Sequence, residues 1–336
     1  MRLSVACLCL CLFISRPLVS SPSKRGSSPE RPPKAGVTTP GVQIALPSLK
    51  NEAEVSLSGT ADAVAFSGSI YVASKSGNVV IPVDAKTNKP DTPIFGFHAP
   101  CAIVNAFSSL WVQNCGNQTL SRLDGKTKKT TATIPVTIAA SQSGYVASAD
   151  SLWILVDDKT TLARLDPDEN KLVSETRLPA GCNSIHFAEA ALWVTCPTEQ
   201  SVLRIDPQTG LQTNKIDVTG KPIAATSGES AIWVLSQLGG KVSKLDPKTN
   251  KVTATIELNL PTPAASISFG DGSVWVGAPG FPITRIDPAA DKVVQQFVGE
   301  GGGPIYLGLN SLWLTNNGPN AVRRFDPKRI KSTLAE

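Results

Sequence analysis

Histidine, tyrosine and methionine are scarce in this sequence: 336 residues include two histidines, three tyrosines and one methionine. Zinc sites and acid–base sites draw heavily on histidine, so His98 and His186 alone leave little material for either. The sequence also lacks an HExxH motif, a GxSxG turn and a Gly-rich phosphate-binding loop. These absences argue against the common motif-bearing hydrolases, metalloproteases and nucleotide-binding enzymes.

Long apolar runs are absent as well. The main apolar stretch, Leu3 to Ile14, spans 12 residues and is too short to cross a bilayer. Because Arg2 precedes this stretch, residues 1–20 are predicted to be a cleaved export signal. We therefore expect a periplasmic or extracellular protein that has no transmembrane segment once the signal is removed.

Positive charge is concentrated outside the expected fold. Of the formal net charge of +5, residues 1–20 carry +2 and residues 21–50 carry +4, which leaves −1 for residues 51–336. Residues 21–50 are rich in Pro, Ser, Gly and basic side chains, a composition that predicts a disordered tether. Nucleic-acid binding requires a basic face on the folded part, so the sequence argues against it.

What the sequence does contain is a repeat with a period near 40 residues. In each of seven copies an aromatic anchor is followed 12 or 13 residues later by an aspartate. The anchors are Tyr71, Trp111, Trp153, Trp193, Trp233, Trp275 and Trp313. The aspartates are Asp84, Asp124, Asp166, Asp206, Asp246, Asp287 and Asp326. A fixed period of this length indicates a repeat architecture.

A complete copy contains four short runs typical of strands, separated by turn signals such as Asp-Pro-x-Thr. In the copy from Pro179 to Val218 these runs are "CNSIHFAEA", "ALWVTC", "SVLRIDP" and "LQTNKIDV". Four strands per copy without an amphipathic helix predict an all-β fold, a seven-bladed β-propeller with four-stranded antiparallel blades. We expect the Trp rings to wedge between adjacent blades, and the aspartates to stabilise turns rather than bind a metal.

The ring is expected to close through its termini. The last copy supplies three strands, and Ala53–Leu57 resembles the fourth strand of other copies, so this segment is predicted to complete the seventh blade. The predicted organisation is a signal at residues 1–20, a tether at 21–50, the propeller at 51–330 and a tail at 331–336. We expect a monomer.

Seven cysteines fall into two groups. Three lie in the expected signal, and the other four form two equally spaced pairs, Cys101 with Cys115 and Cys182 with Cys196. Each pair straddles a predicted hairpin turn, where residues equidistant from the turn lie opposite each other. For an exported protein this predicts two disulfides within single blades. The alternative, a zinc site, needs four convergent ligands, whereas these pairs lie two blades apart.

The units of the form "GSLWV…LxRIDPxTxKV", which cover residues 52–330, resemble the YVTN-type and virginiamycin B lyase-like (streptogramin lyase-like) propeller superfamily. The resemblance implies the fold but little about function, because propellers host enzymes and binding platforms alike. For the lyase branch it implies metal-dependent elimination by His and Glu in "PHGI" or "PHAI" and "WFTE" stretches near the channel.

The catalytic pattern of the lyase branch is not matched. The corresponding stretches here are "PAAS" (Pro263–Ser266), "PIYL" (Pro304–Leu307), "WVGA" (Trp275–Ala278) and "WLTN" (Trp313–Asn316), and none contains His or Glu. We therefore assign no catalytic residue, no metal ligand and no cofactor. His186 is expected to be a core or channel-lining residue.

A ligand, if there is one, is expected at one rim of the channel, formed by loops between second and third strands and by links between blades. The candidate binding residues are His98, Asn114, Asp157, Asp158, Asn183, Glu199, Lys221, Asn316 and Asn317. They are mixed in charge and rich in amides, which favours hydrogen bonding to a polar ligand or a protein loop. The alternative is a merely solvated rim.

The leading functional hypothesis is therefore an exported, non-enzymatic binding or scaffold module. A virginiamycin B lyase-like enzyme, or another propeller lyase or hydrolase with its site on the rim, is the second hypothesis. An accessory propeller of a redox enzyme is the third, which oxidised cysteines would not support.

Overall fold

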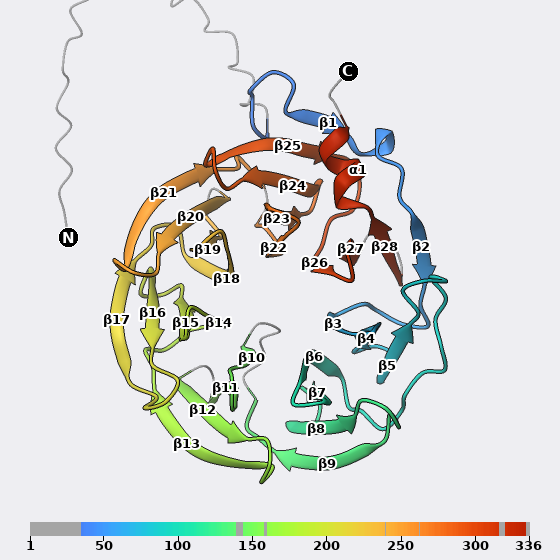
Figure 1. Ribbon diagram of the computed structural model, residues 1–336, viewed down its shortest axis with the longest axis vertical. Helices are drawn as coiled ribbons and strands as arrows, with labels where there is room; N and C mark the ends of the chain where they lie inside the picture. The colour runs from blue at the N-terminus through green and yellow to red at the C-terminus, as the bar shows by residue number, and fades with distance from the viewer. Residues whose placement is uncertain are drawn as a thin grey trace, which may run out of the picture. The chain divides into compact units, whose positions relative to one another are not determined.

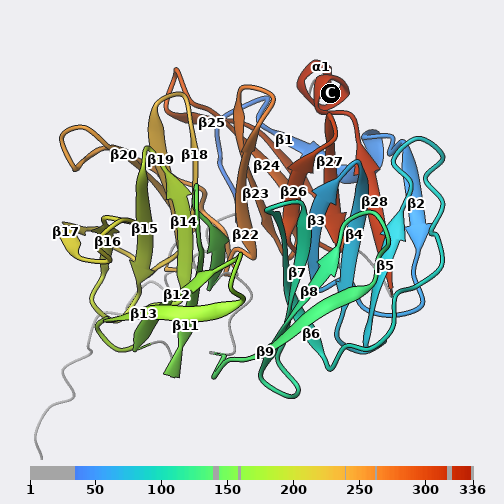
Figure 2. The same ribbon diagram turned by 60° about the horizontal axis from the view of Figure 1, so that its bottom comes forward.

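The computed structural model describes residues 35–138, 144–157, 160–238, 240–261, 263–315 and 320–333. Over these residues the chain forms a ring of seven small sheets around a central axis, which confirms the seven-bladed β-propeller (Figure 1). The inner strands stand along the axis, whereas outer strands such as β9 and β13 wrap obliquely around the outside (Figure 2). The right-handed twist of each sheet accounts for this change of direction.

The first three blades follow one another in chain order, each built from the axis outward. The first contains β3 (Ala63–Ser67), β4 (Ser69–Ser74) and β5 (Val79–Val83). The second contains β6 (Pro100–Ala106), β7 (Ser109–Asn114), β8 (Thr119–Asp124) and β9 (Thr130–Pro135). The third contains β10 (Tyr145–Ala147), β11 (Leu152–Val156), β12 (Thr161–Asp166) and β13 (Lys171–Arg177).

The remaining blades repeat this order. The fourth contains β14 (Ser184–Ala188), β15 (Ala191–Cys196), β16 (Ser201–Ile205) and β17 (Gln212–Asp217). The fifth contains β18 (Pro222–Gly228), β19 (Ala231–Ser236), β20 (Lys241–Asp246) and β21 (Lys251–Glu257). The sixth contains β22 (Ser266–Gly270), β23 (Ser273–Ala278), β24 (Phe281–Asp287) and β25 (Lys292–Val298). The seventh contains β26 (Ile305–Gly308), β27 (Ser311–Thr315), β28 (Ala321–Phe325) and, from the start of the fold, β2 (Ala53–Ser56).

The first blade differs at its outer edge. A continuous fourth strand is replaced there by a segment that meets β5 only at isolated bridges, Val80 with Ile94 and Val83 with Pro90. Pro90 and Pro93 have no backbone N–H, so this segment cannot form a regular ladder.

The predicted closing strand is present. β2 pairs antiparallel with β28, with Ala53 opposite Arg324 and Ser56 opposite Ala321. The Arg323 guanidinium also donates to Glu54 at 2.9 Å. The outer strand of the last blade therefore comes from the start of the fold, as the sequence pattern indicated.

Residues 35–52, most of which the sequence analysis assigned to the tether, form a strap across the outside of the sixth and seventh blades. β1 (Gln43–Ala45) adds to β25 as a parallel fifth strand, and a short 3-10 helix (Leu46–Ser48) follows. Val42, Ile44 and Leu46 are buried. This alternation contains only three buried apolar residues, over residues 42–46, and lies among Pro and Gly, which is why composition alone did not reveal it.

The C-terminal end also packs on the ring. α1 (Pro327–Ser332) is capped by the Asp326 carboxylate, which accepts from the Lys328 N–H, and it buries Ile330. The Gln295 amide on β25 donates to the carbonyls of Ile330 and Thr333 at 2.7 and 2.6 Å. The neighbouring Gln296 accepts from the Val37 N–H in the strap at 2.8 Å. Two adjacent glutamines thus hold both terminal segments against the sixth blade.

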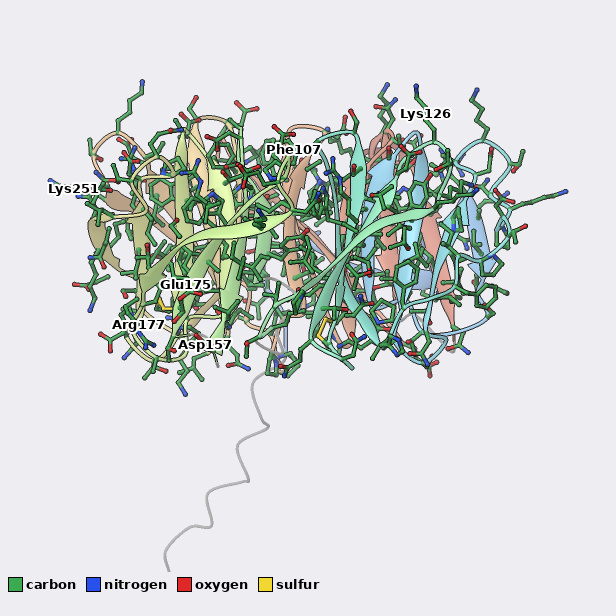
Figure 3. All side chains as sticks on the ribbon, turned by 90° about the horizontal axis from the view of Figure 1, so that it is seen from below. Phe107, Lys126, Asp157, Glu175, Arg177 and Lys251 are labelled. Carbon is green, nitrogen blue, oxygen red and sulfur yellow. A yellow bond between two sulfur atoms is a disulfide. The ribbon has the colours of Figure 1, made fainter. Side chains whose placement is uncertain are left out.

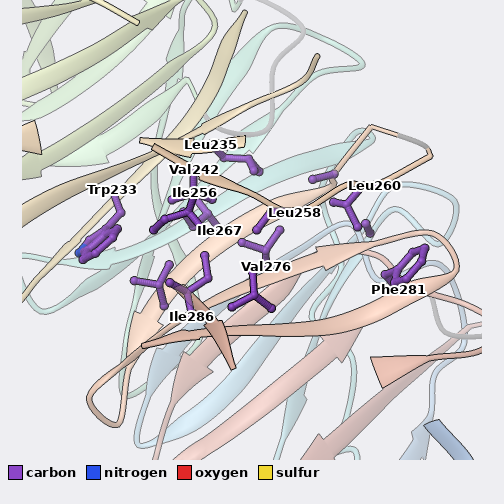
Figure 4. Close-up of a cluster of buried hydrophobic side chains, with 14 of the residues drawn as sticks. Trp233, Leu235, Val242, Ile256, Leu258, Leu260, Ile267, Val276, Phe281 and Ile286 are labelled. Carbon is purple, nitrogen blue, oxygen red and sulfur yellow. The ribbon is translucent and has the colours of Figure 1, made fainter. Parts of the chain in front are cut away.

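The six Trp rings act as the predicted wedges. Each is at most 1% exposed, and each lies in an apolar cluster shared with the next blade. Figure 4 shows one such cluster, which joins Trp233 of the fifth blade with Val276 and Ile286 of the sixth. Burying an aromatic side chain of this size stabilises the fold by about 5 kcal/mol relative to an exposed ring.

A basic side chain two residues before the repeated aspartate joins neighbouring blades. The Arg204 guanidinium lies 5.3 Å from the Trp193 ring centroid, and its Nη1 donates to the Pro247 carbonyl at 2.8 Å and to Asn250 Oδ1 at 2.9 Å. Both acceptors belong to the turn of the following blade. The same contact recurs from Arg122, Lys244 and Arg324, and Arg164 makes a longer version. We call this arrangement the inter-blade latch.

The repeated aspartates stabilise the turns that receive these latches. In six of the seven turns one carboxylate oxygen accepts from backbone N–H groups two and three residues ahead; Asp206, for example, accepts from Gln208 and Thr209 at 2.7 and 3.0 Å. These backbone donors lower the pKa of the carboxyl groups of Asp84, Asp124, Asp166, Asp206, Asp246 and Asp287. The contacts match the turn-stabilising role expected from the sequence.

Both predicted disulfides are present. Cys101 joins Cys115 across the β6–β7 hairpin, and Cys182 joins Cys196 across the β14–β15 hairpin. The Cα atoms are 5.8 and 3.9 Å apart. Each bond ties the beginning of a blade, in or just before its first strand, to the end of the second strand of the same blade.

We expect Arg204→Gln to lower the free energy of unfolding by about 1 to 2 kcal/mol, because it removes a ring contact and two charge-assisted hydrogen bonds. Urea denaturation followed by Trp fluorescence measures the change. A double-mutant cycle with Asn250→Ala should show coupling between the two side chains. Arg177→Gln is the matched control, since among the described residues the Arg177 guanidinium contacts Thr160 and Thr161, at 3.5 and 3.4 Å, within its own blade. Equal losses for Arg204 and Arg177 would contradict the latch.

Replacing Cys182 and Cys196 together by Ala should lower stability by about 3 kcal/mol, because each bond closes a loop of roughly 15 residues in the unfolded chain. Thermal unfolding with and without reductant measures this loss. Reductant should lower the melting temperature of the parent protein more than that of the double variant. Peptide mapping without reduction should show only the pairs within blades, and a Cys101–Cys182 peptide would contradict the pairing.

Candidate functional site

The ring has two faces that carry different loops. Antiparallel pairing brings the loops between second and third strands, and the links between blades, to one face, which we call the rim face. Figure 3 shows Asp157 and both disulfides toward this face, and Lys126 toward the opposite one. The opposite face carries the hairpins between first and second strands and the aspartate turns. The rim face is therefore the one on which the sequence placed its candidate residues.

Several predicted rim residues lie exposed on these loops. His98, Asp157, Glu199 and Lys221 are all exposed. Glu199 forms an ion pair with Lys215 at 2.9 Å, and exposed pairs of this kind contribute little stability. Asp158, Asn316 and Asn317 lie outside the described residues.

Two predicted rim residues have structural contacts instead. Asn114 is 1% exposed; its amide nitrogen donates to Thr119 and Ser121, and its Oδ1 accepts from the His98 N–H at 3.2 Å. Asn183 accepts from the Thr195 hydroxyl at 2.8 Å, beside the Cys182–Cys196 bond. These amides support the loops that carry the exposed residues.

The inner strands enclose a small cavity in the channel near the rim face. Its volume is about 210 Å³. Seven equivalent positions, each one residue before the inner-strand residue that pairs with the anchor aromatic, surround it. These positions are Val64, Ile103, Tyr145, Ile185, Ala225, Ile267 and Ile305, and we call them the channel ring.

The polar groups around the cavity are hydroxyls. Ser184, Ser266 and Ser268 line it together with Tyr145 and Tyr306, and none of its described lining residues is charged. Burial raises the pKa of both tyrosines, so their hydroxyls remain protonated at physiological pH. The Tyr145 hydroxyl is buried and has no hydrogen-bond partner among the described residues.

His186 lies next to the channel on β14, opposite Trp193. Its Nε2 is 2.9 Å from the Ser227 hydroxyl on the inner strand of the fifth blade. Burial lowers the pKa of His186 to about 4, so the ring is neutral at physiological pH. Its placement matches the core or channel-lining role that the sequence favoured.

Two larger hollows of about 760 and 700 Å³ lie outside the channel, beside the last blade, where β2 from the start of the fold closes the ring. The first is bounded by the strap and by the Glu54–Arg323 ion pair, and the second by α1 and hairpins of the last two blades. Both are open hollows formed by the segments that close the ring.

Across the described ranges, no cluster of three or more His, Cys, Asp or Glu side chains is arranged to hold a metal ion. None of the described helices is long and apolar enough to cross a membrane.

Neither the channel ring nor the latch was predicted from the sequence. The basic residue of the latch was visible in the repeat as the Arg or Lys of "LxRIDP", but its target in the next blade was not. The channel ring could have been found by aligning the first strands, because it is the same position in every copy. Short first strands with few shared letters made that alignment weak.

Comparisons with known proteins agree with this architecture. The family model described as outer membrane protein assembly factor BamB matches residues 116–274. A solved streptogramin B lyase structure superposes with a TM-score of 0.66 and 18% identity, covering 81% of this chain and 96% of the other. BamB from Moraxella catarrhalis superposes with a TM-score of 0.58 and 13% identity, covering 78% of this chain and 84% of the other. No curated protein sequence matches the chain.

The family model covers less than half of the chain, and the two structures share little sequence identity with it, so these likenesses concern the fold. They agree with the resemblance stated from the repeat units as far as the fold is concerned: the chain is a seven-bladed β-propeller.

Proposed function

We propose that this protein is exported and acts as a non-enzymatic binding platform that holds a protein partner on its rim face. The observation that carries the proposal is the arrangement of exposed polar and charged groups, His98, Asp157 and Lys221, on loops around the mouth of a cavity whose described lining residues carry no charge. Loops held by rigid sheets present side chains in fixed positions, which is what a recognition surface requires.

Export is supported by the two disulfides. Structural disulfides persist in oxidising compartments and are rare in the cytosol. Cys101, Cys182 and Cys196 are fully buried, so their bonds belong to the packed structure rather than to an exposed redox site. This favours a scaffold over an accessory propeller that exchanges electrons through its cysteines.

A platform is favoured over a lyase or hydrolase by the chemistry of the channel. A general base works best when its pKa is near the operating pH. The histidine closest to the channel has a pKa of about 4 and contacts a serine hydroxyl, not a carboxylate. The described lining of the cavity offers hydroxyls and alkyl groups, which suit binding better than proton transfer.

The comparisons also support a platform. The family model that matches residues 116–274 is described as an assembly factor, and one of the similar structures is BamB itself. The streptogramin B lyase shares the fold, but His and Glu are missing from the four stretches where the lyase pattern would place them.

Site-specific crosslinking tests the platform. We expect a photo-crosslinking amino acid at Asp157 or Lys221 to capture one discrete protein in the producing cells. The same group at Lys126 or Lys251 should not, because Lys126 lies toward the opposite face and Lys251 follows an aspartate turn (Figure 3). Lys221→Glu should weaken binding of the captured protein, whereas Lys126→Glu should not. Equal capture from all four positions would contradict a partner specific to the rim.

The state of His186 tests the argument against catalysis. Its ring signals in NMR should stay in the neutral form down to about pH 4. Because the unfolded chain binds the proton near pH 6.5, stability should fall as pH drops from about 6.5 to 4, by about 1 kcal/mol per pH unit at most. His186→Gln should remove this dependence. If His186 titrated near pH 7, the lowered pKa would be wrong, and this side chain could serve as a general base beside the channel.

A further inference from the structure

The channel ring has one member that does not fit its surroundings. Five of its seven positions carry Ile or Val, as expected where β-branched side chains pack on a strand. Tyr145 occupies the equivalent position in the third blade, and its hydroxyl is buried without a hydrogen-bond partner among the described residues. An aliphatic side chain at this position would avoid the desolvation of an unpaired hydroxyl.

A second member leaves room. Ala225 occupies the same position in the fifth blade, between Ile185 of the fourth blade and Ile267 of the sixth. The cavity of about 210 Å³ has room for about seven water molecules at ~30 Å³ each. It is smaller than the range of about 300 to 1,000 Å³ typical of sites that enclose a whole drug-sized ligand. The space therefore suits a single side chain better than a complete small-molecule ligand.

The lining also sets the charge of an occupant. No charged side chain lies among the described lining residues, and the polar side-chain groups of this lining are tyrosine and serine hydroxyls. A buried charge without a partner is strongly disfavoured, so the occupant must be neutral. Exposed polar and charged residues stand on the loops around the mouth. An apolar centre inside a polar border is the usual anatomy of an interface anchor.

We propose that the channel cavity is the anchor site of the rim: it receives one uncharged, largely apolar side chain of the partner, and the Tyr145 hydroxyl donates a hydrogen bond to an acceptor on that side chain. A tyrosine-type side chain has this chemistry, with an aromatic body and one acceptor oxygen. This inference rests on the proposed function, since it concerns the same face.

Small molecules that mimic the proposed partner side chain test the cavity directly. In methyl NMR of isoleucine-labelled protein, p-cresol should shift the signals of Ile103, Ile185, Ile267 and Ile305, and leave Ile44 and Ile330 unchanged. Toluene, which lacks the acceptor, should bind about fivefold more weakly than p-cresol. Butylammonium and propionate should cause no shift. Equal binding of charged analogues, or no shift with p-cresol, would overturn the inference.

Two variants separate a ligand site from a structural feature. Tyr145→Phe should remove the preference for p-cresol over toluene without lowering stability, because it deletes only an unpaired hydroxyl. A loss of stability with the preference intact would assign Tyr145 a structural role and overturn the inference. Ala225→Ile should abolish binding of both probes by filling the cavity. It should fold, because Ile already occupies the equivalent position in four blades. Ala180→Ile, an exposed change on the rim face outside the cavity lining, is the matched control.

The partner captured by crosslinking separates this inference from the proposed function. Ala225→Ile should weaken its binding at least tenfold, and Ala180→Ile should not. If Ala225→Ile leaves partner binding unchanged while rim crosslinks persist, the anchor is wrong and the platform stands. If no partner is captured although p-cresol binds the cavity, the platform fails, and the cavity is a site for a free small ligand instead of an anchor.

Discussion

The contact between neighbouring blades is the interaction on which the rest of this structure depends. A blade alone cannot bury its apolar faces, so each needs its neighbours for stability. The latch supplies an apolar part, a buried Trp ring, and a polar part, a basic group on that ring that donates to the next turn. The aspartate that shapes each turn presents the acceptors at the right place. The Trp, the basic side chain and the aspartate of the repeat therefore stabilise the fold together only across the boundary between two blades.

A ring built from such contacts must also resist opening where its two ends meet. At this seam Arg324 extends the latch from the last blade to the first, donating to the Ala85 carbonyl and to Asn88. β2 completes the last blade from the start of the fold. The strap and α1 add further closure, since Gln295 and Gln296 hold them against one strand. The seam thus combines the regular contact of the repeat with contacts found nowhere else in the described ring.

The rigidity of the closed ring determines what its surfaces offer for binding. The aspartate turns of the opposite face are engaged in contacts between blades, which leaves the rim loops more freedom to vary in sequence. There the repeat departs from regularity, with disulfides in the second and fourth blades and exposed charged residues, Asp157 and Lys221, at the third and fifth. The channel ring lies directly beneath these loops and is also irregular, at Tyr145 and Ala225. Departures from the repeat are where recognition is expected, because packing alone does not require them.

The sequence by itself determined the number of blades, the closing strand and the disulfide pairs, because each follows from spacing along a repeat whose strands pair locally. It also indicated that the Trp rings pack as wedges and that His186 is a core or channel-lining residue. Only the tertiary structure decided which residues share a site: it buried Asn114 in its own loop, and it joined strap residues to a strand 250 residues away. It also assembled the channel ring from seven separate strands. Such contacts between distant segments leave no periodic signal, because they depend on how seven twisted sheets meet around one axis.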